Sequence, residues 1–295
     1  MVEPKITSRT LQNGHPNAVY GVAFSPDGRQ LASASLDNHV KLWDVQKGEV
    51  LHTLKGHGDG VYAVAYAPSG KKVVSGSLDH SLKIWDSQTG AAEGSLTGHG
   101  NYVTSVKYAA SGKFFVSGGY DKMARSWTPG GQLQVFSGHQ DVVYTVALSP
   151  TQPLLATGSK DGTARLWDLK SGAEQKKLAG HEGPVEGVDF SPDGKQCVTV
   201  GQDGLIIIWE VAAGTIKTRL RGHEGYVKTV AFSPTGNQLA TGGQDGTVRL
   251  WDLQQFRESA VLNEHRNTVY SVCYAPDGKL LASGSFDRHV KLWQL

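Results

Sequence analysis

The sequence has few cysteines, no long apolar run and no segment typical of export. Cys197 and Cys273 lack the spacing of metal ligands and lie in apolar runs, where a free cysteine behaves as a small hydrophobe. A disulfide framework is therefore not expected. No apolar run approaches the ~18 residues that span a bilayer, and residues 1–14 lack the basic start and apolar stretch of a secretory signal. These absences predict an intracellular, cytoplasmic protein that is not secreted and has no membrane partner, with a cytoskeletal, ciliary or nuclear setting left open.

An excess of charge of one sign is also missing. The chain has 29 basic and 27 acidic residues, which gives a net charge of +2, and it contains no block of like charges. A nucleic-acid partner is therefore not expected. At 295 residues the chain is long enough to bury a large core without disulfides or metals.

Histidines recur at a nearly constant interval and set the period of the chain. Their successive gaps are 42, 42, 40, 42, 42 and 42 residues. An aspartate follows each histidine by 22 residues, a tryptophan stands six residues after that aspartate, and a serine or threonine stands four residues before it. The seven sets are His15, Ser33, Asp37, Trp43; His57, Ser75, Asp79, Trp85; His99, Ser117, Asp121, Trp127; His139, Thr157, Asp161, Trp167; His181, Thr199, Asp203, Trp209; His223, Thr241, Asp245, Trp251; and His265, Ser283, Asp287, Trp293.

Each unit has the pattern of four short strands. An apolar run such as VYGVAF follows the histidine, and a tight turn such as SPDG leads to a second run that ends near the aspartate. A third run ends at the tryptophan, and a glycine-containing turn precedes the fourth. Short, evenly spaced strands with no helical period predict a closed all-β architecture. The repeats lie near residues 14–55, 56–97, 98–137, 138–179, 180–221, 222–263 and 264–295.

The recurrence of Gly-His, Asp and Trp-Asp at about 40–45 residues resembles the WD-repeat β-propellers over essentially the whole chain. The resemblance implies a single seven-bladed β-propeller of four-stranded antiparallel blades over residues 1–295. The departures are small. The aspartate after tryptophan is replaced by Thr128, Glu210 and Gln294, the last Gly-His begins with Glu264, and the third unit is two residues shorter at its outer turn, TPGG.

The two ends of the sequence complement each other. The last unit has only three strands, because the sequence ends at Leu295, two residues after its tryptophan. Residues 4–13 precede Gly14-His15 as the fourth run of each unit precedes the next Gly-His. We therefore predict that residues 4–13 form the outer strand of the closing blade, which would remove the exposed sheet edges that invite aggregation.

Serine, histidine and aspartate together also resemble a hydrolase triad. A catalytic constellation occurs once in a protein, whereas this one occurs seven times, with a tryptophan in register. The family resemblance implies a hydrogen-bond chain from tryptophan through the hydroxyl and histidine to aspartate, so we interpret all four residue types as a structural network. No catalytic residue, metal or cofactor is expected. In six units a basic residue, interpreted as part of a solvated face, stands two residues before the tryptophan: Lys41, Lys83, Arg125, Arg165, Arg249 and Lys291.

The resemblance places partner contacts on the face that carries the Gly-His and Asp turns, three and five residues after each histidine and one before each aspartate. Seven of the ten tyrosines fall at these 21 positions. Tyrosine offers a rigid apolar ring with a polar tip, which suits protein interfaces. The alternative, that the tyrosine five residues after histidine packs between blades as core, stays open. The predicted partner-binding residues are Tyr20, Leu36, Tyr62, Leu78, Tyr102, Tyr120, Tyr144, Tyr270 and Phe286.

The favoured function is a non-enzymatic scaffold or adaptor that binds proteins or peptide segments within a larger complex. The alternatives are a propeller enzyme, or a reader of nucleic acid or chromatin, that uses the mouth of the central channel. An enzyme needs a non-repeating cluster there, and Lys160, Glu186 and Lys228 are interpreted as isolated, solvated residues. Cytoskeletal or ciliary components, RNA-processing or signalling adaptors and bacterial interaction modules fit the resemblance equally.

Overall fold

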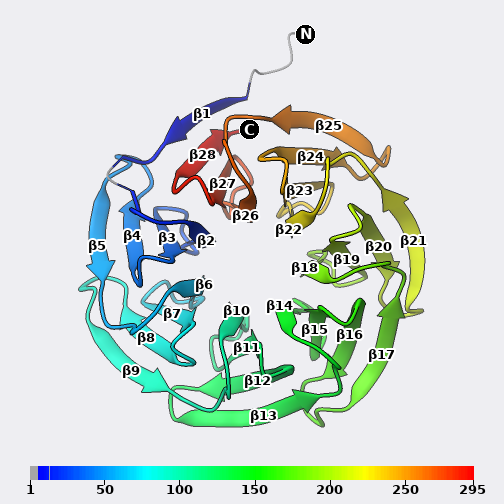
Figure 1. Ribbon diagram of the computed structural model, residues 1–295, viewed down its shortest axis with the longest axis horizontal. Helices are drawn as coiled ribbons and strands as arrows, with labels where there is room; N and C mark the ends of the chain where they lie inside the picture. The colour runs from blue at the N-terminus through cyan, green and yellow to red at the C-terminus, as the bar shows by residue number, and fades with distance from the viewer. Residues whose placement is uncertain (1–5, 13) are drawn as a thin grey trace.

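Seven four-stranded antiparallel sheets surround a central channel (Figure 1). The computed structural model describes residues 6–12 and 14–295. All regular elements among them are β-strands. The predicted fold class, a seven-bladed β-propeller, is confirmed.

In six blades the strands run from the channel outward in sequence order, and in the last blade the outer strand is the first of the chain. The innermost strands are β2 (Val19–Phe24), β6 (Val61–Tyr66), β10 (Val103–Tyr108), β14 (Val143–Leu148), β18 (Val185–Phe190), β22 (Val227–Phe232) and β26 (Val269–Tyr274). The second strands are β3 (Gln30–Ser35), β7 (Lys72–Ser77), β11 (Phe115–Gly119), β15 (Leu154–Ser159), β19 (Gln196–Gly201), β23 (Gln238–Gly243) and β27 (Leu280–Ser285).

The third and outer strands complete each blade. The third strands are β4 (Val40–Asp44), β8 (Leu82–Asp86), β12 (Met123–Thr128), β16 (Thr163–Asp168), β20 (Ile206–Glu210), β24 (Val248–Asp252) and β28 (Val290–Gln294). The outer strands are β5 (Val50–Leu54), β9 (Ala92–Leu96), β13 (Gly131–Ser137), β17 (Glu174–Ala179), β21 (Thr215–Leu220), β25 (Arg257–Leu262) and, in the last blade, β1 (Thr7–Thr10).

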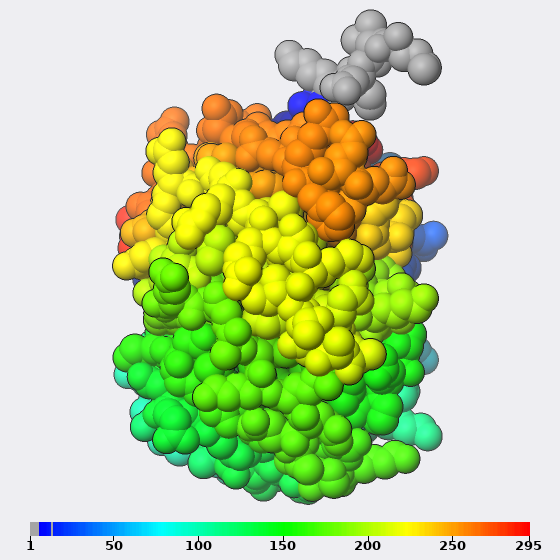
Figure 2. Space-filling model, turned by 90° about the vertical axis from the view of Figure 1, so that its right-hand side faces the viewer, coloured from blue at the N-terminus to red at the C-terminus, as the bar shows by residue number. Residues whose placement is uncertain are grey.

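The core lies between neighbouring blades. The second strand of each blade is buried almost throughout, since it has a blade on either side, whereas the outer strands expose every other residue or more. All seven tryptophans of the third strands are at most 2% exposed. Viewed from the side, the green, yellow and orange residues of the later blades form a continuous wall (Figure 2). No helix long and apolar enough to cross a membrane occurs in the described part of the chain.

The ring is closed by the first strand, as predicted. Strand β1 pairs antiparallel with β28, so that Thr7 lies opposite Gln294 and Thr10 opposite Lys291. One residue further on, the backbone N–H of Leu11 donates to the oxygen of Val290 at 2.9 Å. The observed strand is shorter than the predicted range 4–13, of which residues 4, 5 and 13 lie outside the described residues.

Candidate protein-binding site

The same hydrogen-bonded tetrad occurs in every blade. The indole Nε1–H of each tryptophan donates to the serine or threonine Oγ at 2.8–2.9 Å. The histidine Nε2 lies 2.6–2.8 Å from that same oxygen. The histidine Nδ1 lies 2.7–3.0 Å from the aspartate carboxylate. The hydroxyl accepts a hydrogen bond from the indole N–H and donates its own proton to the histidine Nε2. The histidine Nδ1–H in turn donates to the aspartate carboxylate.

The tetrad of the fourth blade illustrates the electrostatics. Burial, the largest influence, raises the pKa of Asp161, but hydrogen bonds from Thr163 and His139 outweigh it and bring the pKa to about 2. Burial lowers the pKa of His139 below its ordinary value of 6.5, against the opposing influence of Asp161. A neutral imidazole and an ionised carboxylate at neutral pH match the donor–acceptor chain.

The tetrad hydroxyls are unsuited to be nucleophiles. All seven serine and threonine residues of the tetrads are 0% exposed. Each oxygen is already held by an indole and an imidazole, so no face remains for a substrate carbonyl. The geometry supports a structural role for the tetrads.

The basic residues two before the tryptophan are not a solvated face, and that expectation was wrong. In three blades the arginine folds back onto the tetrad aspartate: Arg125 lies 2.9 Å from Asp121, and Arg165 and Arg249 lie 3.7 and 3.4 Å from their aspartates. The position shares a sheet face with the tetrad, because it is two residues from tryptophan on the same strand. These cations therefore extend the buried network.

A β-bulge points one residue of each innermost strand toward the channel mouth. The register between first and second strands shifts around the residue five after the histidine in all seven blades. A bulged residue leaves the ladder and can be turned to a new direction. The bulged residues are Tyr20, Tyr62, Thr104, Tyr144, Glu186, Lys228 and Tyr270. Together with Tyr120 and Gln202 they line a cavity of about 260 Å³ at the mouth.

Aromatic rings gather on part of this mouth. Tyr20 stacks on Tyr270 with ring centroids 4.1 Å apart, and its other neighbour, Tyr62, is 4.3 Å away. Phe286 extends the group beyond Tyr270 at 6.4 Å. A second group consists of Tyr120 with Tyr102 at 5.2 Å and Tyr144 at 6.3 Å.

The predicted partner-binding residues therefore fall into two sets. The seven aromatic ones lie at or beside the mouth, where Phe286 is 46% exposed. Leu36 and Leu78 lie apart from the cavity and pack, half-buried, over Gly60. The tyrosines five after histidine belong to none of the hydrophobic clusters between blades. Tyr20 nevertheless packs half-buried between the tyrosines of both neighbouring blades, so the alternative of packing between blades stays open beside the interface prediction.

The polar part of the mouth was missed by sequence reasoning. Glu186 and Lys228 form an ion pair at 2.7 Å with side chains only 11% and 17% exposed. Gln202 Nε2 donates to the same Glu186 oxygen at 2.6 Å. The expectation that Glu186 and Lys228 are isolated and solvated was wrong. The available signal was their shared position, five after the histidine in adjacent units.

On the innermost strands, a second position also varies. The residue eight after histidine is alanine in four units but Lys107, Asp189 and Cys273 in the others. Burial raises the pKa of Asp189, and it raises the pKa of Cys273 to about 12, with Lys107 opposing both shifts. The thiol is therefore protonated at neutral pH. Within residues 6–12 and 14–295, no group of three or more His, Cys, Asp or Glu residues could hold a metal ion.

The sheets, their closure and the tetrads define a repeat-built β-propeller. The family model "WD domain, G-beta repeat" (WD40) matches residues 6–44, 48–86, 90–128, 130–168, 172–210, 214–252 and 256–294. The chain belongs to the WD40 repeat family.

Individual relatives resemble a short stretch of the chain. "Eukaryotic translation initiation factor 3 subunit I" of Neosartorya fischeri is 51% identical over 47 residues, 16% of this chain and 14% of the relative. "Ribosome assembly protein 4" of Saccharomyces cerevisiae is 55% identical over 40 residues, 14% of this chain and 8% of the relative. Each match has about the length of one repeat, and neither name supports a cytoskeletal setting.

Proposed function

We propose that the chain, as one propeller over residues 1–295, is a non-enzymatic scaffold that binds segments of partner proteins at the channel mouth. The observation that carries this proposal is the aromatic surface around Tyr20, which occurs once in a molecule otherwise made of repeats. A cluster of exposed aromatic rings on a soluble protein marks an interaction site when the rings are contiguous. Here the exposed Phe286 and the half-buried Tyr270, Tyr20 and Tyr62 follow one another in contact.

The mouth is pre-organised for a peptide. Tyr20 is held between two other rings, so little side-chain entropy remains to be lost on binding. Burial raises the pKa of Tyr20 and Tyr62 above the ordinary value of 10.0. Both hydroxyls are therefore neutral, and the Tyr62 hydroxyl, which accepts from Tyr20, can donate to a backbone carbonyl of a bound segment.

The other residues of the mouth favour a protein partner over the alternatives. Glu186 and Lys228 neutralise each other and leave no free acid–base pair between them for catalysis. A neutral tyrosine surface on a chain of net charge +2 does not supply the cationic surface that phosphates need. Neither a cofactor nor a membrane partner is part of the proposal.

The names of the relatives suggest the setting. They denote a subunit of a translation initiation factor and a ribosome assembly protein. By analogy with them we place the protein inside the cell, in the cytoplasm, as a component of a larger complex.

The test is a paired substitution, Tyr62→Ala with Tyr270→Ala, which removes the rings on both sides of Tyr20. Affinity capture with quantitative mass spectrometry compares the variant with the wild type, and circular dichroism and thermal melting report folding. We expect partners to be lost while the fold and the melting temperature are kept. The matched control is Tyr226→Ala, a tyrosine of the same face that is 39% exposed and outside the two aromatic groups. Equal capture by all three proteins, or unfolding of the double variant, would contradict the proposal.

A further inference from the structure

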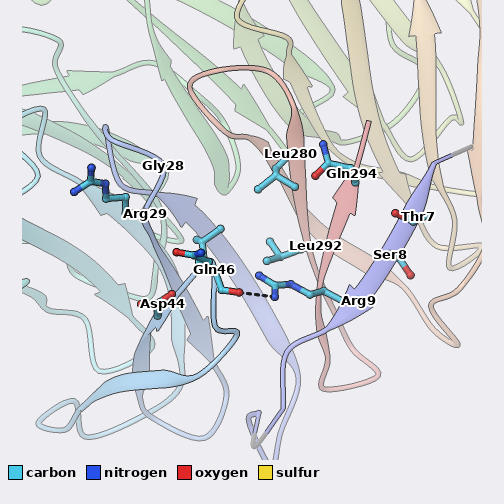
Figure 3. A pocket seen from close by; sticks show the side chains of 11 residues that line it. Thr7, Ser8, Arg9, Gly28, Arg29, Asp44, Gln46, Leu280, Leu292 and Gln294 are labelled. Atoms are coloured by element: carbon cyan, nitrogen blue, oxygen red, sulfur yellow. Dashed lines mark hydrogen bonds between the residues drawn. The ribbon is translucent and has the colours of Figure 1, made fainter. Parts of the chain in front are cut away.

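Two grooves between blades open at the end of the strands opposite the Asp turns. One lies between the last and first blades, with a volume of about 760 Å³, and the other between the third and fourth blades, with about 560 Å³. In the first groove Leu280 and Leu292 project into the space, and Arg9 reaches across to the backbone oxygen of Gln46 at 2.8 Å (Figure 3). Each groove lies beside a blade in which the turn from third to outer strand is incomplete.

The two blades differ from the rest in different ways. In the last blade the third and outer strands, β28 and β1, come from opposite ends of the sequence, so no turn joins them. In the third blade the turn at residues 128–131 is two residues shorter than its counterparts.

The short turn of the third blade also lacks a bond that the other six blades have. In those, the backbone N–H of the second residue after tryptophan donates to the turn between first and second strands at 2.9–3.0 Å, as Val45 does to Arg29. The third blade has Pro129 at this position, which has no N–H to donate. The two turns at this end of the third blade therefore lack the backbone hydrogen bond that joins them in the other blades. Leu133, which follows the shorter turn, is 58% exposed.

The groove between the third and fourth blades has a firm apolar floor. Phe114, Leu148 and Leu169 line it and also pack against the buried cluster between these blades. Leu133 stands on β13, which is the edge strand of its sheet. Among the described residues that line the groove, Lys170 is the only charged one.

We propose that this groove is a second docking site, for an extended segment of a partner protein that carries an apolar side chain next to a carboxylate. The apolar side chain packs against Leu133 and the floor, and the carboxylate meets the ammonium group of Lys170. The extended form follows from the free edge of β13, which can pair with a further strand. The site lies at the opposite end of the strands from the channel mouth, so the protein can hold two partners at once.

The probe is a displayed library of random 12-residue peptides, selected on the immobilised full chain. We expect enrichment of peptides that contain Leu, Ile or Phe beside Asp or Glu. Labelled copies of the enriched peptides, measured by fluorescence anisotropy, should bind Leu133→Ser about tenfold more weakly, because the main apolar contact is lost. Lys170→Glu should favour peptides with a basic neighbour instead. The matched control is Leu51→Ser, since Leu51 occupies the same position in a blade with a full turn and is 41% exposed.

A second variant tests the origin of the groove. Two residues inserted between Gly130 and Gly131 restore the common repeat length and should abolish peptide binding while the melting temperature is kept. Peptides that bind Leu133→Ser and the lengthened variant as well as wild type, or a selection without enrichment, would overturn the proposal. If the enriched peptides instead fail to bind the Tyr62→Ala, Tyr270→Ala double variant, they bind at the channel mouth and the proposal for the groove is overturned. Light scattering detects self-association. If the protein self-associates and Leu133→Ser prevents it, the occupant of the groove is a second copy of this chain, and the proposal of a partner segment is overturned.

Discussion

The tetrads and the channel mouth are built on the same repeat, yet they behave oppositely along it. The tetrads present the same four residue types seven times, with histidine–aspartate distances confined to 2.7–3.0 Å. The bulged positions at the mouth carry four tyrosines, a threonine, a glutamate and a lysine on an equally regular backbone. Repetition therefore indicates what holds the ring together, and the variation on the repeated backbone coincides with the surface that we propose for binding.

The difference has a physical cause. A tetrad is buried, so each polar atom must find its partner within the blade and a change of one member leaves the others unsatisfied. A bulged tyrosine at the mouth is bounded by open space on one side, so its side chain can change without leaving a buried charge unpaired. Glu186 and Lys228, which pair with each other, are the exception among the bulged residues.

Removing the closing strand should have the largest effect on stability, because the tetrads and the channel mouth both depend on the closed ring. Deletion of residues 1–13 takes away the pairing of Thr7–Thr10 with β28 and the buried side chain of Leu11, which is 2% exposed. We expect aggregation, or a fall in melting temperature of roughly 10 °C or more. Thermal melting with light scattering measures it, and Thr7→Ala, an exposed change on the same strand, is the control. An unchanged melting temperature would refute the closure by β1.

Cutting one tetrad should have the next largest effect and should act on stability alone. Asp161→Ala leaves His139 Nδ1 and the backbone N–H groups of Gln140 and Thr163 without their acceptor. We expect a loss of about 1–3 kcal/mol in the free energy of unfolding, measured by urea denaturation. Glu182→Ala, an exposed change next to the fifth tetrad, should stay within about 0.5 kcal/mol. Loss of partner binding by folded Asp161→Ala protein would contradict the division between the two regions.

Much of this arrangement could be predicted from sequence because it depends on position within one repeat. The tetrads follow from fixed intervals, and the closing strand follows from the similarity of residues 4–13 to the fourth run of every unit. The ion pair of Glu186 with Lys228 could not be predicted with the same ease, since it joins side chains of two neighbouring blades. Leu36 and Leu78 were assigned to the binding surface from their positions, but they pack over Gly60, whose lack of a side chain makes room for them.

The groove illustrates a different limit. The two-residue shortening of the third unit was visible in the sequence, and it leaves the strands of that blade in place, as expected. The exposure of Leu133 and the missing hydrogen bond at Pro129 depend on how the turn lies against the next blade. The periodicity of the strands does not describe that arrangement.

Mild acid should have the smallest effect and should also separate the two regions. Burial lowers the pKa of His15, His57 and His139 below 6.5 in the folded state, so the unfolded chain takes up protons at a higher pH than the folded one. The stability that these histidines contribute is therefore complete above about pH 6.5 and is lost as the pH falls toward the folded-state values. Asp79 and Asp161, with pKa values of about 2, add a further loss below about pH 4.

We therefore expect the free energy of unfolding to be lower at about pH 5.5 than at about pH 7.5, as measured by urea denaturation in buffers of equal ionic strength. Partner binding at the mouth should not change with pH, because the tyrosines there are neutral across this range. Partner affinity measured on the folded fraction should accordingly stay constant between the two pH values. Equal stability at both pH values would mean that burial does not keep the tetrad histidines neutral. A change in affinity without a change in stability would mean that a group at the mouth titrates in this range and contributes to binding.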